Sequence, residues 1–159
     1  MTTYDNLPDN TRVWIYQSNR ALTNDEVEAV QGSLNDFTTQ WVSHNRQLRA
    51  YGDVLYQHFI VLMVDESNAG ASGCSIDSSV HYVQDLQRQL GVDFFDRMVF
   101  AWKENEEVKI AQRDEFARLY KEGKINDDTL VFDNLVNTKS DFESQWVKPL
   151  KSSWHTRMV

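Results

Sequence analysis

The chain has 159 residues, with 24 acidic against 16 basic side chains and a formal net charge of −8 at neutral pH. This length suits a single domain, and leucine, isoleucine, valine and phenylalanine make up about a quarter of the residues, enough for a packed core. The acidic balance argues against a nucleic-acid partner, which would require a basic surface. We therefore expect one domain over residues 1–159 that binds no nucleic acid.

Cysteine usage and apolar runs bear on the location of the protein. Cys74 is the only cysteine, so no internal disulfide can form, as is usual in a reducing cytosol. The longest apolar run, residues 59–64, is far shorter than the ~18 residues that a bilayer requires. Residues 1–5 lack the basic and apolar regions of a secretory signal. These features predict a cytoplasmic protein with no membrane span.

The first predicted element is a strand over residues 12–17, which is rich in β-branched and aromatic side chains. A helix follows, because Thr23 and Glu26 have the spacing of a capping box. Its apolar stripe recurs at steps of three and four residues: Val27, Val30, Leu34, Phe37 and Trp41. A weaker strand is expected over residues 47–56, and the apolar run 59–64 is typical of a central strand buried on both faces.

A second helix is predicted over residues 75–90, with Gly91 as its C-cap. The side chains expected to face the core are Ile76, Val80, Val83, Leu86 and Leu90. The remaining predicted elements are a hairpin of residues 98–102 and 107–111, a short helix over 114–122, a strand over 129–132, and a closing helix capped by Thr138 that runs through Phe142 and Trp146.

The element order indicates the fold class. The first six elements follow the order β-α-β-β-α-β of the ferredoxin-like unit, which places both helices on one face of the sheet. We therefore predict an α+β two-layer sandwich with a mostly antiparallel sheet, a ferredoxin-like core as the candidate arrangement, and a C-terminal extension. The strand order is left open.

Several catalytic motifs are missing from the sequence. The P-loop pattern needs a glycine five residues before its Gly-Lys pair, whereas Arg118 stands there before Gly123-Lys124. Neither the dinucleotide fingerprint nor the nucleophile elbow occurs. The four histidines have no zinc-site spacing. We expect neither a metal nor a cofactor.

The region around Cys74 contains the one local set of residues with nucleophilic chemistry. A thiol at a helix start is biased toward the thiolate by the helix dipole, and a histidine nearby could act as its base. The candidate residues here are Gly73, Cys74, Ser75, Asp77, Ser78 and His81. The competing interpretation, which we favour, is structural, because lone cysteines are commonly buried and Ser and Asp commonly cap helices.

A second candidate group follows the last predicted strand and includes the tail. Asn134 and Asn137 are candidate ligand-binding residues, although Asn also serves ordinary turns. Trp154 lies outside any periodic stripe, and His155 beside it is a candidate catalytic base. Residues 16–20 are polar enough to line the same cleft, and Arg20 is a candidate anion partner there.

Segments 12–20, 71–80 and 131–138 and the closing Ser153-Trp154-His155 carry a family resemblance. The chain resembles a group of small uncharacterised proteins from Bacteroidetes that often bear the automated label "ABC transporter ATPase". That label implies ATP hydrolysis, which needs a P-loop, a Walker B strand and a signature loop. Only Val64-Asp65-Glu66 is similar to any of these. We therefore expect no ATPase activity, and the resemblance supplies no catalytic residues.

Three functions remain open from the sequence. The first, which we favour, is a non-enzymatic cytosolic domain that binds a small ligand or a protein partner, with a homodimer expected. The second is a cysteine-dependent enzyme or thiol sensor that uses Cys74 with His81 or His155 as base. The third is nucleotide binding by the loop 70–75. Convergence of Cys74, Asn134 and His155 on one pocket would favour the second.

Overall fold

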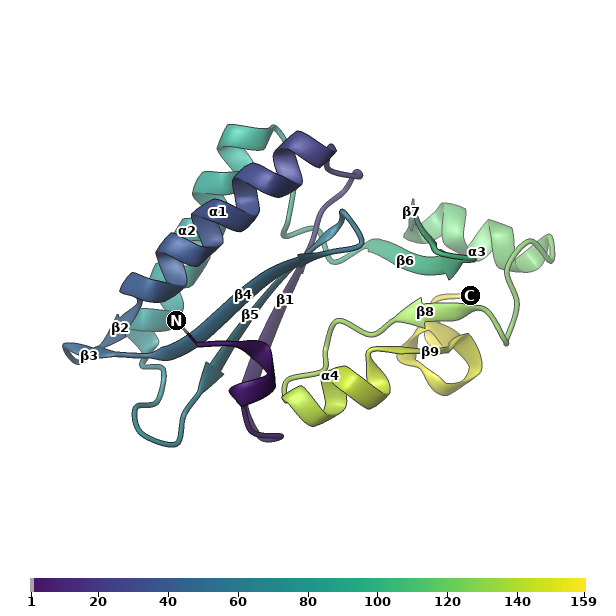
Figure 1. Cartoon of the computed structure of the whole chain (residues 1–159). Coiled ribbons are helices and arrows are strands. Elements are labelled where there is room, and N and C mark those ends of the chain that lie inside the picture. The colour runs from purple at the N-terminus through teal and green to yellow at the C-terminus, as the bar shows by residue number, and fades with distance from the viewer. Residues whose placement is uncertain (1) are drawn as a thin grey trace.

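The computed structural model describes residues 2–159. Its first sheet has the order β1-β5-β4, formed by β1 (Arg12–Gln17), β4 (Arg49–Leu55) and β5 (Phe59–Asp65). Both outer strands run antiparallel to β5 and therefore parallel to each other. α1 (Asn24–Gln40) and α2 (Gly73–Leu90) cover one face of this sheet (Figure 1). The α+β class and the mostly antiparallel pairing are confirmed.

α1 begins at the predicted capping box. Thr23 Oγ1 accepts a hydrogen bond from the Glu26 N–H at 3.1 Å, and the Glu26 carboxylate accepts one from the Thr23 N–H at 2.9 Å. Both bonds satisfy backbone donors that the first helical turn would leave unpaired. Leu34 is fully buried on the inner face. The helix ends at Gln40, so that Trp41 follows it as the C-cap residue.

α2 departs from its predicted start and from part of its predicted inner face. It begins at Gly73 rather than Ser75, because Ser72 is the N-cap and accepts the Ser75 N–H at 3.2 Å. The buried positions are Ser75, Ser79, Val83 and Leu86, whereas Ile76, Val80 and Leu90 are only half-buried. The predicted end is confirmed, since Gly91 takes the left-handed conformation at φ 66°.

The C-terminal half builds a second antiparallel sheet of order β7-β6-β8-β9. Its strands are β6 (Val99–Glu104), β7 (Glu107–Gln112), β8 (Leu130–Phe132) and β9 (Val147–Pro149), with α3 (Arg113–Lys121) and α4 (Lys139–Gln145) between them. The hairpin of β6 and β7 is as predicted, and β9 was not expected. The short elements are β2 (Val42–Ser43), β3 (Arg46–Gln47) and three 3₁₀ turns: η1 (Tyr4–Asn6), η2 (Leu150–Ser152) and η3 (Trp154–Met158).

Strands β1, β4 and β5 have the arrangement of a split β-α-β unit, but β6 does not join their sheet. A ferredoxin-like sheet would place its fourth strand beside β1, but β6 pairs with β7 and β8 instead. The open edge of β1 is met by the segment before α4, where the Val13 N–H donates to the Asn137 carbonyl at 3.0 Å. Two main sheets, with the separate two-stranded pair β2-β3, therefore replace the single sheet that the sequence predicted.

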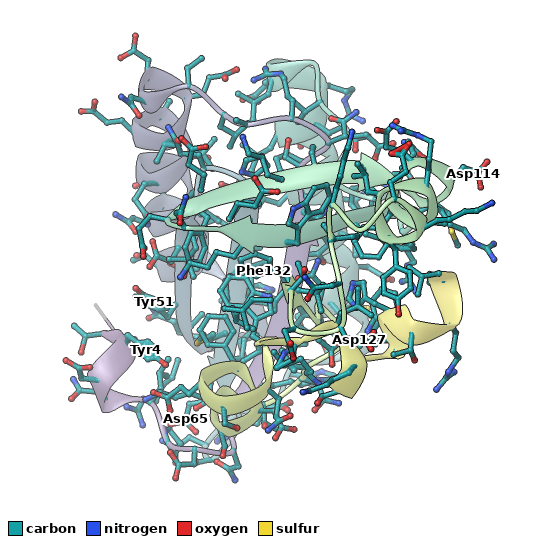
Figure 2. The ribbon with its side chains drawn as sticks, turned by 90° about the vertical axis from the view of Figure 1, so that its right-hand side faces the viewer. Tyr4, Tyr51, Asp65, Asp114, Asp127 and Phe132 are labelled. Carbon is teal, nitrogen blue, oxygen red and sulfur yellow. The ribbon has the colours of Figure 1, made fainter. Side chains whose placement is uncertain are left out.

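The core has two main layers, one on each face of β5, whose residues are all buried. One layer lies under α1 and α2 and includes Ile60 and Leu62. The other includes Phe59 and Val61 and extends to Phe132 and Trp146 of the C-terminal half. Phe132 lies near the centre of the molecule in Figure 2. Its ring centroid is 4.8 Å from that of Phe59. Among the described residues, no helix is both long and apolar enough to cross a membrane.

Candidate functional site

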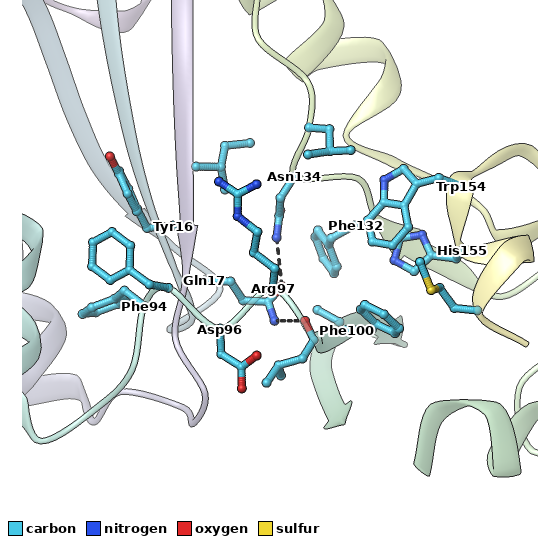
Figure 3. Close-up of a pocket in the computed structure, with 16 residues that line it drawn as sticks. Tyr16, Gln17, Phe94, Asp96, Arg97, Phe100, Phe132, Asn134, Trp154 and His155 are labelled. Carbon is cyan, nitrogen blue, oxygen red and sulfur yellow. Dashed lines mark hydrogen bonds between the residues drawn. The ribbon is translucent and has the colours of Figure 1, made fainter. Parts of the chain in front are cut away.

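A pocket of about 370 Å³ opens where the two sheets meet (Figure 3). The end of β1, the loop between α2 and β6, the start of β6, the segment after β8 and η3 all contribute to it. Its aromatic lining consists of Tyr16, Phe94, Phe95, Phe100, Phe132 and Trp154, and its polar lining of Gln17, Asp96, Arg97, Asn134 and His155. The aliphatic lining consists of Ile15, Val99, Ala101, Leu135 and Met158. A concave, mostly apolar site with a few polar groups is typical of small-molecule pockets.

Two aromatic faces border the pocket. Trp154 and His155 stack on each other with ring centroids 3.8 Å apart and planes inclined by 16°, and Phe100 meets Trp154 edge to face at 5.5 Å. Tyr16 and Phe95 form an edge-to-face pair at 5.5 Å. Figure 3 shows Tyr16 and Phe94 on one side and Trp154 with His155 on the other.

His155 is only 1% exposed, yet it lines the pocket. Its Nδ1 lies 2.6 Å from Ser153 Oγ. Its other ring nitrogen, Nε2, has no hydrogen-bond partner among the described residues. The only described side-chain nitrogen or oxygen atoms that are both sealed from solvent and unpartnered are Thr11 Oγ1 and Ser43 Oγ. The His155 Nε2 is therefore not sealed from solvent. Burial lowers the pKa of His155 to about 4, so the imidazole is neutral at pH 7.

A hydrogen-bonded chain crosses from the first sheet to the second at the pocket. Asn134 Nδ2 donates to Gln17 Oε1 at 2.9 Å, and Gln17 Nε2 donates to the Val99 carbonyl at 3.0 Å. Trp146 Nε1 donates to Asn134 Oδ1 at 2.9 Å. These bonds fix the Asn134 and Gln17 amides at the pocket wall, as the dashed lines of Figure 3 show for two of them.

Asp133 holds the indole of Trp154 in place. One carboxylate oxygen accepts from Trp154 Nε1 and from the Leu135 N–H, at 2.9 and 3.0 Å, and the other accepts from Lys148 Nζ at 2.9 Å. Burial raises the pKa of Asp133, but the hydrogen bonds from Lys148, Trp154 and Leu135 outweigh it and leave the pKa below its ordinary value. The carboxylate therefore stays charged and supports this wall of the pocket.

Arg97 and Asp96 are the charged residues of the lining. The Asp96 oxygens accept from the Met98 N–H at 2.9 Å and from Gln112 Nε2 at 3.3 Å. Arg97 is exposed and forms no ion pair with the described carboxylates. In Figure 3 its side chain extends toward Asn134. Within residues 2–159, no group of three or more His, Cys, Asp or Glu could hold a metal ion.

The structure brings together some of the predicted site residues. Asn134, Trp154 and His155 all line the pocket, as do Tyr16 and Gln17 of the polar segment 16–20. Asn137 and Arg20 do not line it. The side chain of Asn137 is exposed while its carbonyl pairs with β1.

Arg20 is held by its own neighbours. Its guanidinium forms two 2.8 Å hydrogen bonds to the Glu26 carboxylate and a 2.9 Å bond to the Leu90 carbonyl. The side chain thereby joins the start of α1 to the end of α2. This geometry assigns Arg20 a structural contact and leaves the candidate role of anion partner without support.

Cys74 lies at the far end of α2 from the pocket. The helix has 18 residues, or about 27 Å at 1.5 Å per residue, and only the loop after its C-terminus reaches the pocket. Cys74 is exposed, and its carbonyl accepts a hydrogen bond from Ser78 Oγ at 3.0 Å. Asp77, Ser78 and His81 are exposed as well. Cys74, Asn134 and His155 therefore do not converge on one pocket.

The glycine-containing loop before α2 is occupied by internal contacts. The Glu66 carboxylate accepts the Ala71 N–H at 2.9 Å, so an acidic side chain fills the place that a phosphate would need. The Ser75 Oγ donates to the Ser72 carbonyl at 2.8 Å, and Ser75 is buried. Gly73 is exposed at the first helical position. The loop 70–75 therefore has the contacts of an ordinary helix start.

The loop between α2 and β6 was missed as part of the site. Phe94, Phe95, Asp96 and Arg97 all line the pocket from this loop. The available signal was a pair of adjacent phenylalanines that begins three residues after the helix C-cap Gly91, outside any helical or strand periodicity. Aromatic side chains in a loop require a partner to cover them.

The fold and the pocket define an α+β protein with a ligand-sized site between two sheets. Comparison with protein-family models, with curated proteins and with solved structures found no match for this chain. Its function is therefore argued from the site alone.

Proposed function

We propose that this protein is a non-enzymatic binding protein that holds a small, mostly apolar molecule in the pocket between its sheets. The observation that carries the proposal is the aromatic-lined pocket of about 370 Å³, which the otherwise buried His155 also lines. Volumes of about 300–1,000 Å³ are usual for small-molecule sites. The amides of Gln17 and Asn134 add fixed polar groups that could orient a ligand. In keeping with the single cysteine, we expect the protein to act in the cytosol.

Ligand-observed NMR with the full chain tests this proposal. The probes are three neutral flat molecules: indole, benzamide and naphthalene-2-carboxamide. We expect at least one to bind, and the variant Phe95→Ala to weaken it about five- to tenfold, since Phe95 is part of an aromatic wall. Val42→Ala removes a similarly exposed apolar side chain outside the pocket and serves as the control. Equal weakening in both variants would contradict the proposal, as would the absence of binding by any flat aromatic probe, neutral or anionic.

A protein partner is the second candidate function, and the rim of the pocket favours it. Leu135 and Phe95 are 67% and 37% exposed, and nearby Met98 is 47% exposed. Exposed apolar residues around a concave site are common at protein interfaces. Light scattering tests whether the partner is a second copy of the chain. A homodimer is supported if the mass of the native chain doubles with rising concentration and the mass of Leu135→Glu does not. A native chain that stays monomeric at all concentrations would exclude the homodimer.

A further inference from the structure

We propose that the pocket binds a planar aromatic molecule that carries a carboxylate or a similar anionic group. The ring would lie between the Trp154–His155 stack and the Tyr16–Phe95 pair, and the anion would lie at Arg97. This inference rests on the proposed function and specifies the chemical class of the ligand.

The shape of the site favours a flat ring. Trp154 and His155 stack face to face, so each ring covers one face of the other and the stack offers the outer face of one ring to a ligand. Phe100 supports this stack edge to face, and Asp133 fixes the indole through Trp154 Nε1. A planar ligand gains stacking and edge-to-face contacts with such rings, and these contacts add to its apolar burial.

The charge distribution favours an anion at one end of the ring. Arg97 has no ion-pair partner among the described carboxylates, whereas the other charged lining residue, Asp96, already accepts hydrogen bonds from Met98 and Gln112. A guanidinium presents paired N–H donors that match a carboxylate.

The buried imidazole supplies the remaining polar contact. The Nδ1 of His155 is engaged by Ser153 Oγ, and the opposite nitrogen, Nε2, is unpartnered and not sealed from solvent, in a residue that lines the pocket. A neutral imidazole can donate or accept at this atom according to its tautomer. A heteroatom or hydroxyl on the ring of the ligand would satisfy it, and a purely hydrocarbon ring would leave it unpaired.

A matched pair of probes tests the charge requirement. Naphthalene-2-carboxylate and naphthalene-2-carboxamide share one ring system and differ in charge. Isothermal titration at pH 7 and low salt with the full chain should give about tenfold tighter binding for the carboxylate. In Arg97→Gln the ratio should fall to near one, because the carboxylate loses its charged partner. The control Arg46→Gln makes the same change in net charge in the distant β3 and should leave the ratio unchanged.

The outcomes separate this inference from the proposed function. If the amide binds as tightly as the carboxylate, or if Arg97→Gln preserves the ratio, the anionic class is wrong and the binding function stands. The class is also wrong if neither naphthalene binds while indole or benzamide does. If no probe of either experiment binds, the proposed function itself fails.

Discussion

His155 links the chemistry of the pocket to the stability of the fold. Its imidazole is buried against Phe100 and Phe116, with ring centroids 5.5 and 5.8 Å away. Burial lowers its pKa from 6.5 to about 4, because a charged imidazole would lose its hydration there. The unfolded chain therefore takes up a proton near pH 6.5, and the folded chain only near pH 4.

The first prediction follows from that difference. The stabilising effect of a neutral His155 is complete above pH 6.5 and is lost as the pH falls toward 4, because protons then favour the unfolded chain. The full loss corresponds to about 3 kcal/mol. Urea unfolding measures the free energy of unfolding at pH 7 and at pH 4. Between these pH values the native chain should lose about 3 kcal/mol more than His155→Phe, because the phenylalanine side chain cannot be protonated.

Exposed His81 supplies the control for this measurement. His81→Gln removes a histidine that lies on the outer surface of α2, and it should keep the acid sensitivity of the native chain. Other acid-sensitive groups, such as Asp65 and Asp133, are present in all three proteins and cancel in the comparison. An equal loss in the native chain and in His155→Phe would show that His155 is not the source.

At the scale of elements, local signals in the sequence were sufficient for α1 and insufficient for the start of α2. The box of Thr23 and Glu26 is a contact between near neighbours, and it forms as predicted. At α2, a run of small residues contains several serines that could cap the helix, and Ser72 is the N-cap in the structure. The helix packs Ser75 and Ser79 inward because Trp41 covers this end and donates Nε1–H to the Ser75 carbonyl at 2.9 Å. Such a long-range contact has no local signal.

The second prediction concerns glycines in and beside these helices. Gly32 lies within α1, is exposed, and a Cβ there would meet nothing within 4 Å. Gly32→Ala should therefore stabilise the protein by about 0.5–1 kcal/mol, through helix propensity. Gly91 has φ +66°, where a Cβ is strained, so Gly91→Ala should destabilise by about 1 kcal/mol. Thermal unfolding of both variants measures the two effects, and a shift of the same sign in both would contradict this argument.

At the scale of the whole molecule, the pocket could be predicted only in part. Asn134, Trp154 and His155 stood out because polar and aromatic residues there fell outside any periodic pattern. These residues and the loop 94–97 form one pocket because β6 belongs to a second sheet and does not pair with the first. The order of elements alone favoured a single sheet, since β6 occupies the position of the fourth ferredoxin-like strand. The pairing of β6 with β8 is a long-range contact that periodicity does not encode.

The third prediction is that the two sheets unfold together. Phe59 of the first sheet packs on Phe132 and Trp146 of the C-terminal half, and Asn134 bonds across to Gln17. Asn134→Ala should therefore destabilise the whole fold by about 1–3 kcal/mol, because it also leaves Trp146 Nε1 without its acceptor. In the double variant Asn134→Ala/Gln17→Ala, the decrease in the free energy of unfolding should be about 1 kcal/mol smaller than the sum of the decreases in the two single variants.

Native-state hydrogen exchange distinguishes joint unfolding from separate unfolding. If the sheets form one cooperative unit, Asn134→Ala lowers the opening free energy of the most protected amides equally in β5 and in β6. A decrease confined to β6 would show that the C-terminal half opens alone, and the pocket would then lie between two independently stable parts. Asn126→Ala is the matched control, because its exposed side-chain oxygen accepts only the local Asp128 N–H, so it should leave both strands unchanged. Joint unfolding would also mean that a ligand held between the sheets stabilises both of them to the same extent, since it binds only when both are folded.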